Sequence, residues 1–290
     1  MIKQSGGASM SRAMLLTVFL LNVALNLVSV KNSYAQQLHN DNTKPLRIAV
    51  ATNFTPILKI LLEDFTKQTG INGQIISGAS GAMFLQIQHG APFDIFLSAD
   101  SLRPQDLEQA GYITKGSRKT YAIGQLALYS SSTDISLNTK TLLEHLTNPP
   151  TRFAIANPKI APYGKAAKEV LVHLDVWPRY QSQLIQGINI GQTFAQIRSK
   201  AVQMGIVANS QLVLNNLSGI VIPSSYHQPI EQQLVIVAAS KQQAAAKKLT
   251  DFLLSPQSQK VIVSYGYSQV NANDKEVGNS DEQASTLAIK

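Results

Sequence analysis

Short apolar runs alternate with amphipathic stretches along most of the chain, and this alternation limits the folds that the sequence can adopt. The first run, 46–51, reads LRIAVA and predicts a buried strand, and the residues after it carry apolar side chains at helical spacing up to Gly70. Strands are predicted at 73–77 and 93–98, with a helix over 82–89 between them. Strands joined by helices pair in parallel, so the pattern predicts an α/β protein with mostly parallel sheets covered by helices.

The later part of the chain predicts a second unit of the same kind. A long apolar run, 121–129, predicts one strand, and we expect the chain to pass from the first unit to the second within it. Further elements are predicted at 142–146, 152–156, 163–174, 184–188, 193–203, 205–208, 219–223, 233–239, 242–254 and 257–265. If the strand at 233–239 returns to the first unit, the chain crosses twice between two domains, and a ligand cleft lies between them.

The N-terminal residues 1–35 predict an export signal. Two basic residues precede an apolar run at 13–30, and Ser33-Tyr34-Ala35 then supplies a small residue, a spacer and a small residue. This order predicts a signal peptide that is cleaved after Ala35 and a protein located in the periplasm. A membrane anchor is the alternative, but two asparagines interrupt a run that is already short for a membrane span.

The composition excludes several classes of function. The chain has no cysteine, which excludes disulfides, thiolate metal sites and cysteine nucleophiles. Its net charge of +8 falls to +5 (22 basic minus 17 acidic residues) without residues 1–35, and no basic stripe indicates a nucleic-acid partner. The five histidines occur singly, and Ala82 stands where a nucleophile elbow needs glycine. We therefore predict a binding protein and not an enzyme.

Four junctions between a strand and a helix share small, hydroxyl-bearing or amide-bearing residues. They lie at 51–54, 77–81, 161–164 and 187–193. A helix begins with unpaired N–H groups and a partial positive charge, which together attract an anion. Each junction alone is compatible with an ordinary capped helix, but four of them in one chain favour a binding site.

The same junctions indicate the kind of anion. Thr52 and Ser80 can add hydroxyl donors, and Gly81 and Gly191 let the backbone approach closely. None of the four junctions contains lysine or arginine. A cage of uncharged donors suits a fully ionised oxyanion that only accepts hydrogen bonds, whereas a phosphate that retains a proton needs an acceptor as well.

The chain resembles the periplasmic molybdate-binding proteins of ABC importers over about 46–270. The stretches that carry the resemblance are VATNFTPIL (50–58), SGASGAMFLQIQHGAPFDIFLSAD (77–100), FAIANPKIAPYGKAAKEVL (153–171), GINIGQTFAQI (187–197), GIVANSQL (205–212) and YGY (265–267). The resemblance implies a two-lobed class II periplasmic binding protein fold. It also implies molybdate or tungstate as the ligand, no cofactor, a membrane permease as the partner, and a monomer.

The resemblance implies a boundary for each lobe and a role for five residues. We expect lobe 1 to comprise 46–125 plus 230–270, lobe 2 to comprise 126–229, and the polar segment 271–290 to be a disordered tail. The expected ligand donors come from both lobes, with Ser80 using its hydroxyl and its N–H and the last two using their backbone N–H: Thr52, Asn53, Ser80, Tyr163 and Ile190.

The chain departs from the family pattern at two positions. Ala208 stands where several members have a tyrosine hydroxyl donor, and Asn53 stands where many have serine. Asn53 is therefore expected to close the cage in place of that tyrosine. The alternatives to a molybdate binder are a binding protein for sulfate, phosphate or another oxyanion, a ligand-sensing regulatory domain, and an exported hydrolase. The export signal and the lack of a DNA-binding module argue against the regulatory domain.

Overall fold

The computed structural model of the chain describes residues 44–131, 142–147 and 150–270. The predicted signal peptide, 1–35, and the predicted tail, 271–290, lie outside the described residues. The residues from Pro45 onward belong to a compact unit of their own, and the fold described below is the fold of that unit. Within the described ranges, no helix has both the length and the apolar character needed to cross a membrane.

The first sheet has five strands in the order β2-β1-β3-β10-β4. Their bounds are β1 (Leu46–Ala51), β2 (Gly73–Gly78), β3 (Ile95–Leu97), β4 (Lys119–Gly124) and β10 (Ile230–Ile236). β1 pairs in parallel with β2 and β3, whereas β10 pairs antiparallel with β3 and β4. Four strands of this sheet therefore run in one direction, and β10 runs against them.

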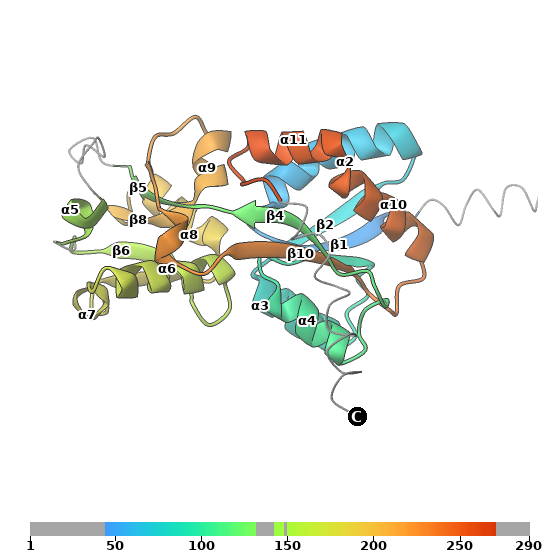
Figure 1. Cartoon of the computed structure of the whole chain (residues 1–290), viewed down its shortest axis with the longest axis horizontal. Helices are drawn as coiled ribbons and strands as arrows, with labels where there is room; N and C mark the ends of the chain where they lie inside the picture. The colour runs from blue at the N-terminus through green and yellow to red at the C-terminus, as the bar shows by residue number, and fades with distance from the viewer. Residues whose placement is uncertain (1–43, 132–141, 148–149, 271–290) are drawn as a thin grey trace, which may run out of the picture. The chain divides into compact units, whose positions relative to one another are not determined.

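The second sheet repeats this plan in the order β7-β6-β8-β5-β9. Its strands are β5 (Leu126–Ser130), β6 (Phe153–Ala156), β7 (Leu184–Gly187), β8 (Met204–Ala208) and β9 (Ile220–Val221). β6 pairs in parallel with β7 and β8, and β5 pairs antiparallel with β8 and β9. The two sheets form the two lobes of an α/β fold, and the one reversed strand of each sheet belongs to a segment that joins the lobes (Figure 1).

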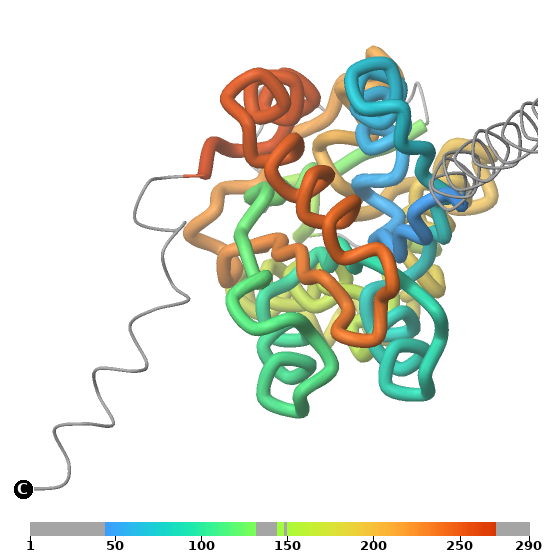
Figure 2. Tube along the Cα trace, turned by 90° about the vertical axis from the view of Figure 1, so that its right-hand side faces the viewer, coloured from blue at the N-terminus to red at the C-terminus, as the bar shows by residue number. Residues whose placement is uncertain are grey.

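Helices cover both faces of the first sheet (Figures 1 and 2). One face carries α2 (Thr55–Thr69), α10 (Gln243–Leu254) and α11 (Pro256–Ser264), and the other carries α3 (Ser80–Gln88) and α4 (Leu102–Gln109). The alternation of side chains along β1 divides the core accordingly. Ile48 and Val50 pack in one cluster with Ile57 of α2, and Ala49 packs in another with Met83 of α3.

The second sheet is covered in the same way. The elements around it are α5 (Leu142–Thr147), α6 (Pro162–His173), α7 (Trp177–Tyr180), α8 (Ile190–Arg198), α9 (Asn209–Leu214) and the 3-10 turn Ser224–Tyr226. Phe153 and Ile155 of β6 pack with Val170 of α6, whereas Ala154 between them packs with Ile197 of α8. Every strand of the inner part of this sheet is thus buried on both faces.

The apolar run at 121–129 is two strands and not one. β4 ends at Gly124 in the first sheet, and β5 begins at Leu126 in the second, so Gln125 is the residue at which the chain changes lobe. The carbonyl of Gln125 accepts a hydrogen bond from Asn209 N–H (2.9 Å), which ties the crossing point to the end of β8. Apolar continuity cannot reveal this break, because the run is buried on both sides of it.

Two helices begin earlier than the sequence pattern predicts. α3 begins at Ser80 and not at Ala82, and α8 begins at Ile190 and not at Thr193. The glycines that suggested a loop occupy the second helical position in each case, where a glycine does not end a helix. This shift places Ser80 and Ile190 at the first position of their helices, where the N–H group has no partner within the helix.

Candidate functional site

A small cavity lies where β1, β2, β6 and β7 end and α2, α3, α6 and α8 begin. Its volume is about 10 Å³, which is close to the space that one buried water needs. The lining residues come from both lobes: Ala51, Thr52, Asn53, Gly78, Ala79, Ser80, Ala99, Ala161, Pro162, Tyr163, Asn189 and Ile190. All five residues expected from the sequence therefore lie around one cavity.

Six lining residues have a backbone N–H group without a partner in the described chain: Asn53, Ala79, Ser80, Tyr163, Asn189 and Ile190. Four of these six, Asn53, Ser80, Tyr163 and Ile190, are residues that the sequence predicts as ligand donors. Each of these four stands at or just before the first turn of a helix: α2, α3, α6 and α8 respectively. Unpaired donors and helix dipoles from both lobes thus converge on the same small space.

The caps of these helices explain why the donors remain free. α3 and α6 are preceded by Ala79 and Ala161, which are extended and carry no side-chain oxygen that could cap the helix. α8 is capped by Asn189, but its side chain accepts from Gln192 N–H (2.9 Å) and leaves Ile190 unpaired. A buried helix start without a cap is unusual, and an anion in the cavity would supply the missing acceptor.

Ser80 adds a side-chain donor. The residue is 1% exposed, and its Oγ accepts a hydrogen bond from the N–H of Ala99 (2.9 Å). In the described part of the chain, no group accepts the hydroxyl hydrogen of Ser80. This hydrogen is available to a ligand together with the N–H of the same residue.

Thr52 lies at the cavity with both of its donors already used. Its hydroxyl donates to the carbonyl of Gly78 (3.0 Å), and its N–H donates to the same oxygen (3.1 Å). These two bonds join the end of β1 to the end of β2. In this geometry Thr52 shapes the wall of the cavity, and its methyl group faces the other lobe near Gly191.

Asn53 offers its backbone to the cavity, while its side chain is bonded elsewhere. The amide Nδ2 donates to Gln232 Oε1 (2.9 Å) and to Tyr267 Oη (3.0 Å), which uses both of its hydrogens. Tyr267 Oη in turn donates to the carbonyl of Asn53 (3.2 Å). Ala208 is fully buried and does not line the cavity, so no side-chain donor comes from either of the two positions at which the chain departs from the family pattern.

Gln232 connects residues of the two lobes beneath the cavity. It is fully buried on β10; its Oε1 accepts from Asn53 and from Tyr121 Oη (3.0 Å), and its Nε2 donates to Tyr163 Oη (3.0 Å). Asn53 and Tyr163 supply unpaired N–H groups from opposite lobes, so one amide holds both of them. Sequence inspection does not reveal this link, because Gln232 lies 179 residues from Asn53.

Burial keeps the tyrosines of this network neutral. Burial raises the pKa of Tyr121 and of Tyr163 well above the usual tyrosine value, and the neighbouring Tyr267 raises both further. Burial also raises the pKa of Tyr267 to about 12, although hydrogen bonds to its oxygen lower it in part. The network therefore brings no negative charge near the cavity at neutral pH.

The cavity has no charged lining residue in the described chain, and the charges lie beside it. A hollow of about 590 Å³ shares Ala99, Ala161 and Pro162 with the cavity. Six charged side chains line this hollow: Asp100, Arg103, Lys159, Lys165, Glu169 and Glu231. No group of three or more metal-ligating side chains exists among the described residues. No charged side chain of the described chain therefore lines the cavity as a counter-ion for an anion.

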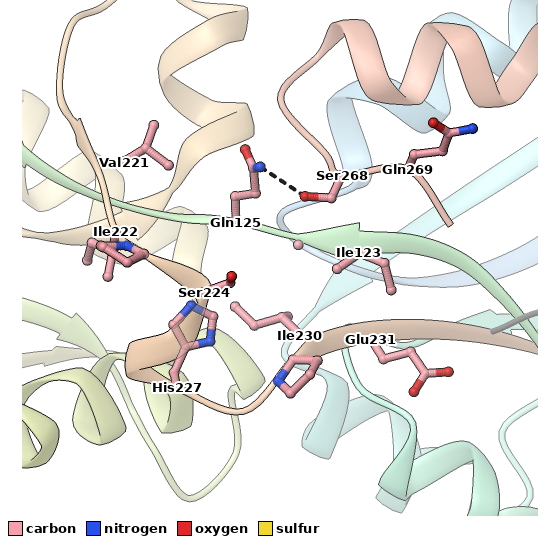
Figure 3. Close-up of a pocket in the computed structure, with 13 residues that line it drawn as sticks. Ile123, Gln125, Val221, Ile222, Ser224, His227, Ile230, Glu231, Ser268 and Gln269 are labelled. Atoms are coloured by element: carbon pink, nitrogen blue, oxygen red, sulfur yellow. Dashed lines mark hydrogen bonds between the residues drawn. The ribbon is translucent and has the colours of Figure 1, made fainter. Parts of the chain in front are cut away.

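A third hollow, of about 570 Å³, lies beside the segments that join the lobes (Figure 3). Gln125 and Ser268 form a hydrogen bond at its edge (2.9 Å), and His227 and Glu231 are its titratable side chains. None of the residues predicted to bind a ligand lines it. The hollow therefore lies where the chain passes between the lobes, away from the starts of α2, α3, α6 and α8.

Comparison with known proteins places the chain among binding proteins. Residues 46–268 match the profile of a family described as bacterial extracellular solute-binding protein. The chain is 38% identical over 226 residues to the molybdate-binding protein ModA of Azotobacter vinelandii, covering 77% of this chain and 89% of that one. It is also 38% identical over 224 residues to ModA of Rhodobacter capsulatus, covering 76% of this chain and 86% of that one.

A solved structure agrees with these relatives. The periplasmic molybdate-binding protein of Azotobacter vinelandii superposes with a TM-score of 0.74 at 35% identity, covering 78% of this chain and all of that chain.

Proposed function

Because the chain belongs to the family of bacterial extracellular solute-binding proteins, we propose that it captures molybdate, and also tungstate, in the cavity between its lobes. One observation carries this proposal. Unpaired N–H groups at the starts of helices from both lobes surround a space that no charged side chain lines among the described residues. Such a site favours a small anion that accepts hydrogen bonds from all sides.

The chemistry of the ion matches the donors. Molybdate at neutral pH is a fully ionised tetrahedral dianion, and each of its oxygens accepts hydrogen bonds only. We assign the donors to the N–H groups of Asn53, Ser80, Tyr163 and Ile190 and to the hydroxyl of Ser80. Thr52 is proposed to hold the loop in place through Gly78, and its hydroxyl reaches the ion only if it leaves that carbonyl.

The lining also favours molybdate over protonated phosphate. A hydrogen phosphate carries a proton that needs an acceptor, and no carboxylate or histidine lines the described cavity. Sulfate has the charge and shape of molybdate but shorter bonds, so selectivity against it depends on how far apart the lobes hold the donors.

The remaining parts of the proposal follow from the family. We propose that residues 46–125 plus 230–270 and residues 126–229 act as two lobes that close on the ion. The protein is proposed to act as a monomer in the periplasm, after removal of residues 1–35, and to deliver the ion to the membrane permease of an ABC importer. Its relatives are binding proteins, and no catalytic step is proposed for this chain.

Calorimetric titration of the mature chain tests the ligand assignment. Molybdate, tungstate, sulfate and phosphate are titrated separately into the protein freed of bound anions. We expect saturable binding of molybdate and tungstate and at least a hundredfold weaker binding of sulfate, a difference of about 2.7 kcal/mol. Equal or tighter binding of sulfate or phosphate would mean that the site exists but serves an oxyanion other than molybdate. Binding of none of the four would reject an oxyanion function.

A further inference from the structure

Two glycines occupy equivalent positions at the cavity, one on each lobe. Gly81 is the second residue of α3, directly after Ser80, and Gly191 is the second residue of α8, directly after Ile190. In both helices, therefore, the first residue brings an unpaired N–H to the cavity and the second residue has no side chain. Neither glycine has a left-handed backbone, so their conformation alone does not require glycine.

Gly81 contacts the backbone of the opposite lobe. Its N–H donates to the carbonyl of Ile160 (3.0 Å), which precedes α6 in the second lobe. A Cβ added at position 81 would lie 2.9 Å from that oxygen and 3.1 Å from Ile160 Cα. It would also lie 3.0 Å from Arg103 Nη2, which is the end of a flexible side chain and can move. The carbonyl of Ile160 is backbone, in the turn between β6 and α6 of the second lobe.

Gly191 makes the reciprocal contact. A Cβ added at position 191 would lie 2.4 Å from Thr52 Cγ2, which belongs to the first lobe, and 3.6 Å from Thr52 Cβ. Within its own lobe, the nearest atom is Asn189 Oδ1 at 3.2 Å, which is close but tolerable after a small shift. Only the Thr52 methyl group from the other lobe makes an alanine at position 191 impossible in the closed arrangement.

We propose that these contacts form a glycine seam, consisting of Gly81 against Ile160 and Gly191 against Thr52, that sets how far the lobes close. This proposal rests on the proposed function, because the seam residues are the ones that position the donors of that site. A methyl group on either glycine acts as a wedge. It leaves each lobe intact, holds the lobes apart and draws the donors away from the ion.

A third glycine near the cavity shows what a contact within one lobe looks like. A Cβ at Gly164, in α6, would lie 2.1 Å from the carbonyl oxygen of Ala156 at the end of β6, and both belong to the second lobe. A methyl group there disturbs the packing of helix on strand, whereas one at Gly81 or Gly191 meets the facing lobe. The seam glycines are thus distinct from a glycine that the fold itself requires.

The Gly191→Ala variant and its compensating partner test the seam. We expect Gly191→Ala to weaken molybdate binding about tenfold or more, as overpacking of a closed contact would. Thr52→Ser removes Cγ2 and keeps the hydroxyl that bonds Gly78, so Gly191→Ala should weaken binding far less in the Thr52→Ser background than in the parent. An equal loss in both backgrounds overturns the proposal. Gly81→Ala, which wedges the lobes from the other side, should reproduce the loss of affinity.

The distance between the lobes gives a readout that does not depend on ligand identity. Since the chain has no cysteine, spin labels can be placed at Leu85→Cys and Val172→Cys, positions that are 51% and 53% exposed on different lobes. The most closed distance should be longer with Gly191→Ala and return toward the parent value with Thr52→Ser added. An unchanged distance contradicts the seam. If the parent binds none of the oxyanions, the proposed function fails, but the spin-label distances still show whether the seam limits how closely the lobes approach.

Discussion

The Oγ of Ser80 accepts a hydrogen bond from the N–H of Ala99 at 2.9 Å, within the first lobe and at the wall of the cavity. This bond holds the hydroxyl oxygen in place and leaves its hydrogen as a donor. Together with the unpaired N–H of the same residue, Ser80 then offers two donors on one side of the cavity.

Replacing Ser80 with alanine should weaken molybdate binding. The variant removes one donor to a buried charge and leaves the N–H of Ala99 without an acceptor, and hydrogen bonds to charged groups contribute about 1.5–3 kcal/mol. Titration calorimetry should therefore show an affinity lower by a factor of about 10–150. Ser225→Ala, at an exposed serine away from the cavity, is the matched control. Parent-like affinity in Ser80→Ala would remove Ser80 from the site.

Replacing Gln232 with methionine should damage both stability and binding. The variant removes the acceptor of one Asn53 amide hydrogen and the donor to the Tyr163 hydroxyl, while Asn53 keeps Tyr267 and Tyr121 keeps the carbonyl of Ser98 (3.1 Å). Each buried group left unsatisfied costs about 1–3 kcal/mol. Denaturant unfolding measures the loss of stability, and calorimetry on the fraction that remains folded measures the loss of affinity. The exposed Gln74→Met serves as control. Weak binding with unchanged stability would show that Gln232 does not act through this network.

Replacing Gln232 with glutamate should make binding depend on pH. A carboxylate can keep both accepted bonds, but once ionised it places a negative charge beneath a site for a dianion. Molybdate affinity should therefore fall as pH rises through the pKa of the new carboxyl group, whereas the parent should show no such fall. Calorimetry at a series of pH values measures the difference. A flat profile in the variant would mean that the charge at position 232 does not reach the ion.

The free energy of unfolding should decrease at alkaline pH. Burial raises the pKa of Tyr267 to about 12 from the usual 10, so the unfolded chain loses this proton first as pH rises. The stabilisation from this neutral tyrosine is fully present below pH 10 and is lost between pH 10 and about 12. A shift of two pKa units corresponds to about 2.7 kcal/mol of unfolding free energy. Tyr267→Phe should reduce this alkaline loss, while Tyr112→Phe, at an exposed tyrosine, should retain it.

Gly164→Ala should destabilise the protein with or without ligand. Its Cβ would lie 2.1 Å from a backbone oxygen of β6, so helix α6 must move away from its own sheet. Overpacking of this kind costs about 1–3 kcal/mol or more and should lower the melting temperature of the ligand-free protein. The seam variants Gly81→Ala and Gly191→Ala should melt near the parent. A melting temperature lowered equally in all three would argue that the seam glycines also serve their own lobes.

The sequence predicted the parts of the fold that depend on local pattern. The run LRIAVA is β1 over the predicted residues, since its burial is nearly continuous, and the helix that ends at Gly70 is α2. The sequence pattern did not predict helix α4, because only Pro104 and Leu107 are buried along it and two such residues make no apolar repeat. The pattern also did not predict the break between β4 and β5 at Gln125, because both strands that flank it are apolar.

The sequence predicted which five residues lie together, but not the geometry of each one; their role as ligand donors stays a prediction. All five predicted residues line the cavity, since strand ends and helix starts of an α/β fold meet at one edge. The direction of the Asn53 side chain could not be predicted, because it depends on Gln232 and Tyr267, both far away in the sequence. The glycines at 81 and 191 suggested close approach to a ligand, whereas the atoms nearest to their missing side chains belong mainly to the facing lobe.

A crystal structure of the mature chain with molybdate tests the central claim most directly. We expect one tetrahedral ion in the cavity between α2, α3, α6 and α8. Its oxygens should lie within hydrogen-bond distance of the N–H groups of Asn53, Ser80, Tyr163 and Ile190 and of the Ser80 hydroxyl, with no charged side chain in contact. An ion held by the arginine and lysines of the neighbouring hollow, or a cavity left empty at saturating molybdate, would contradict it.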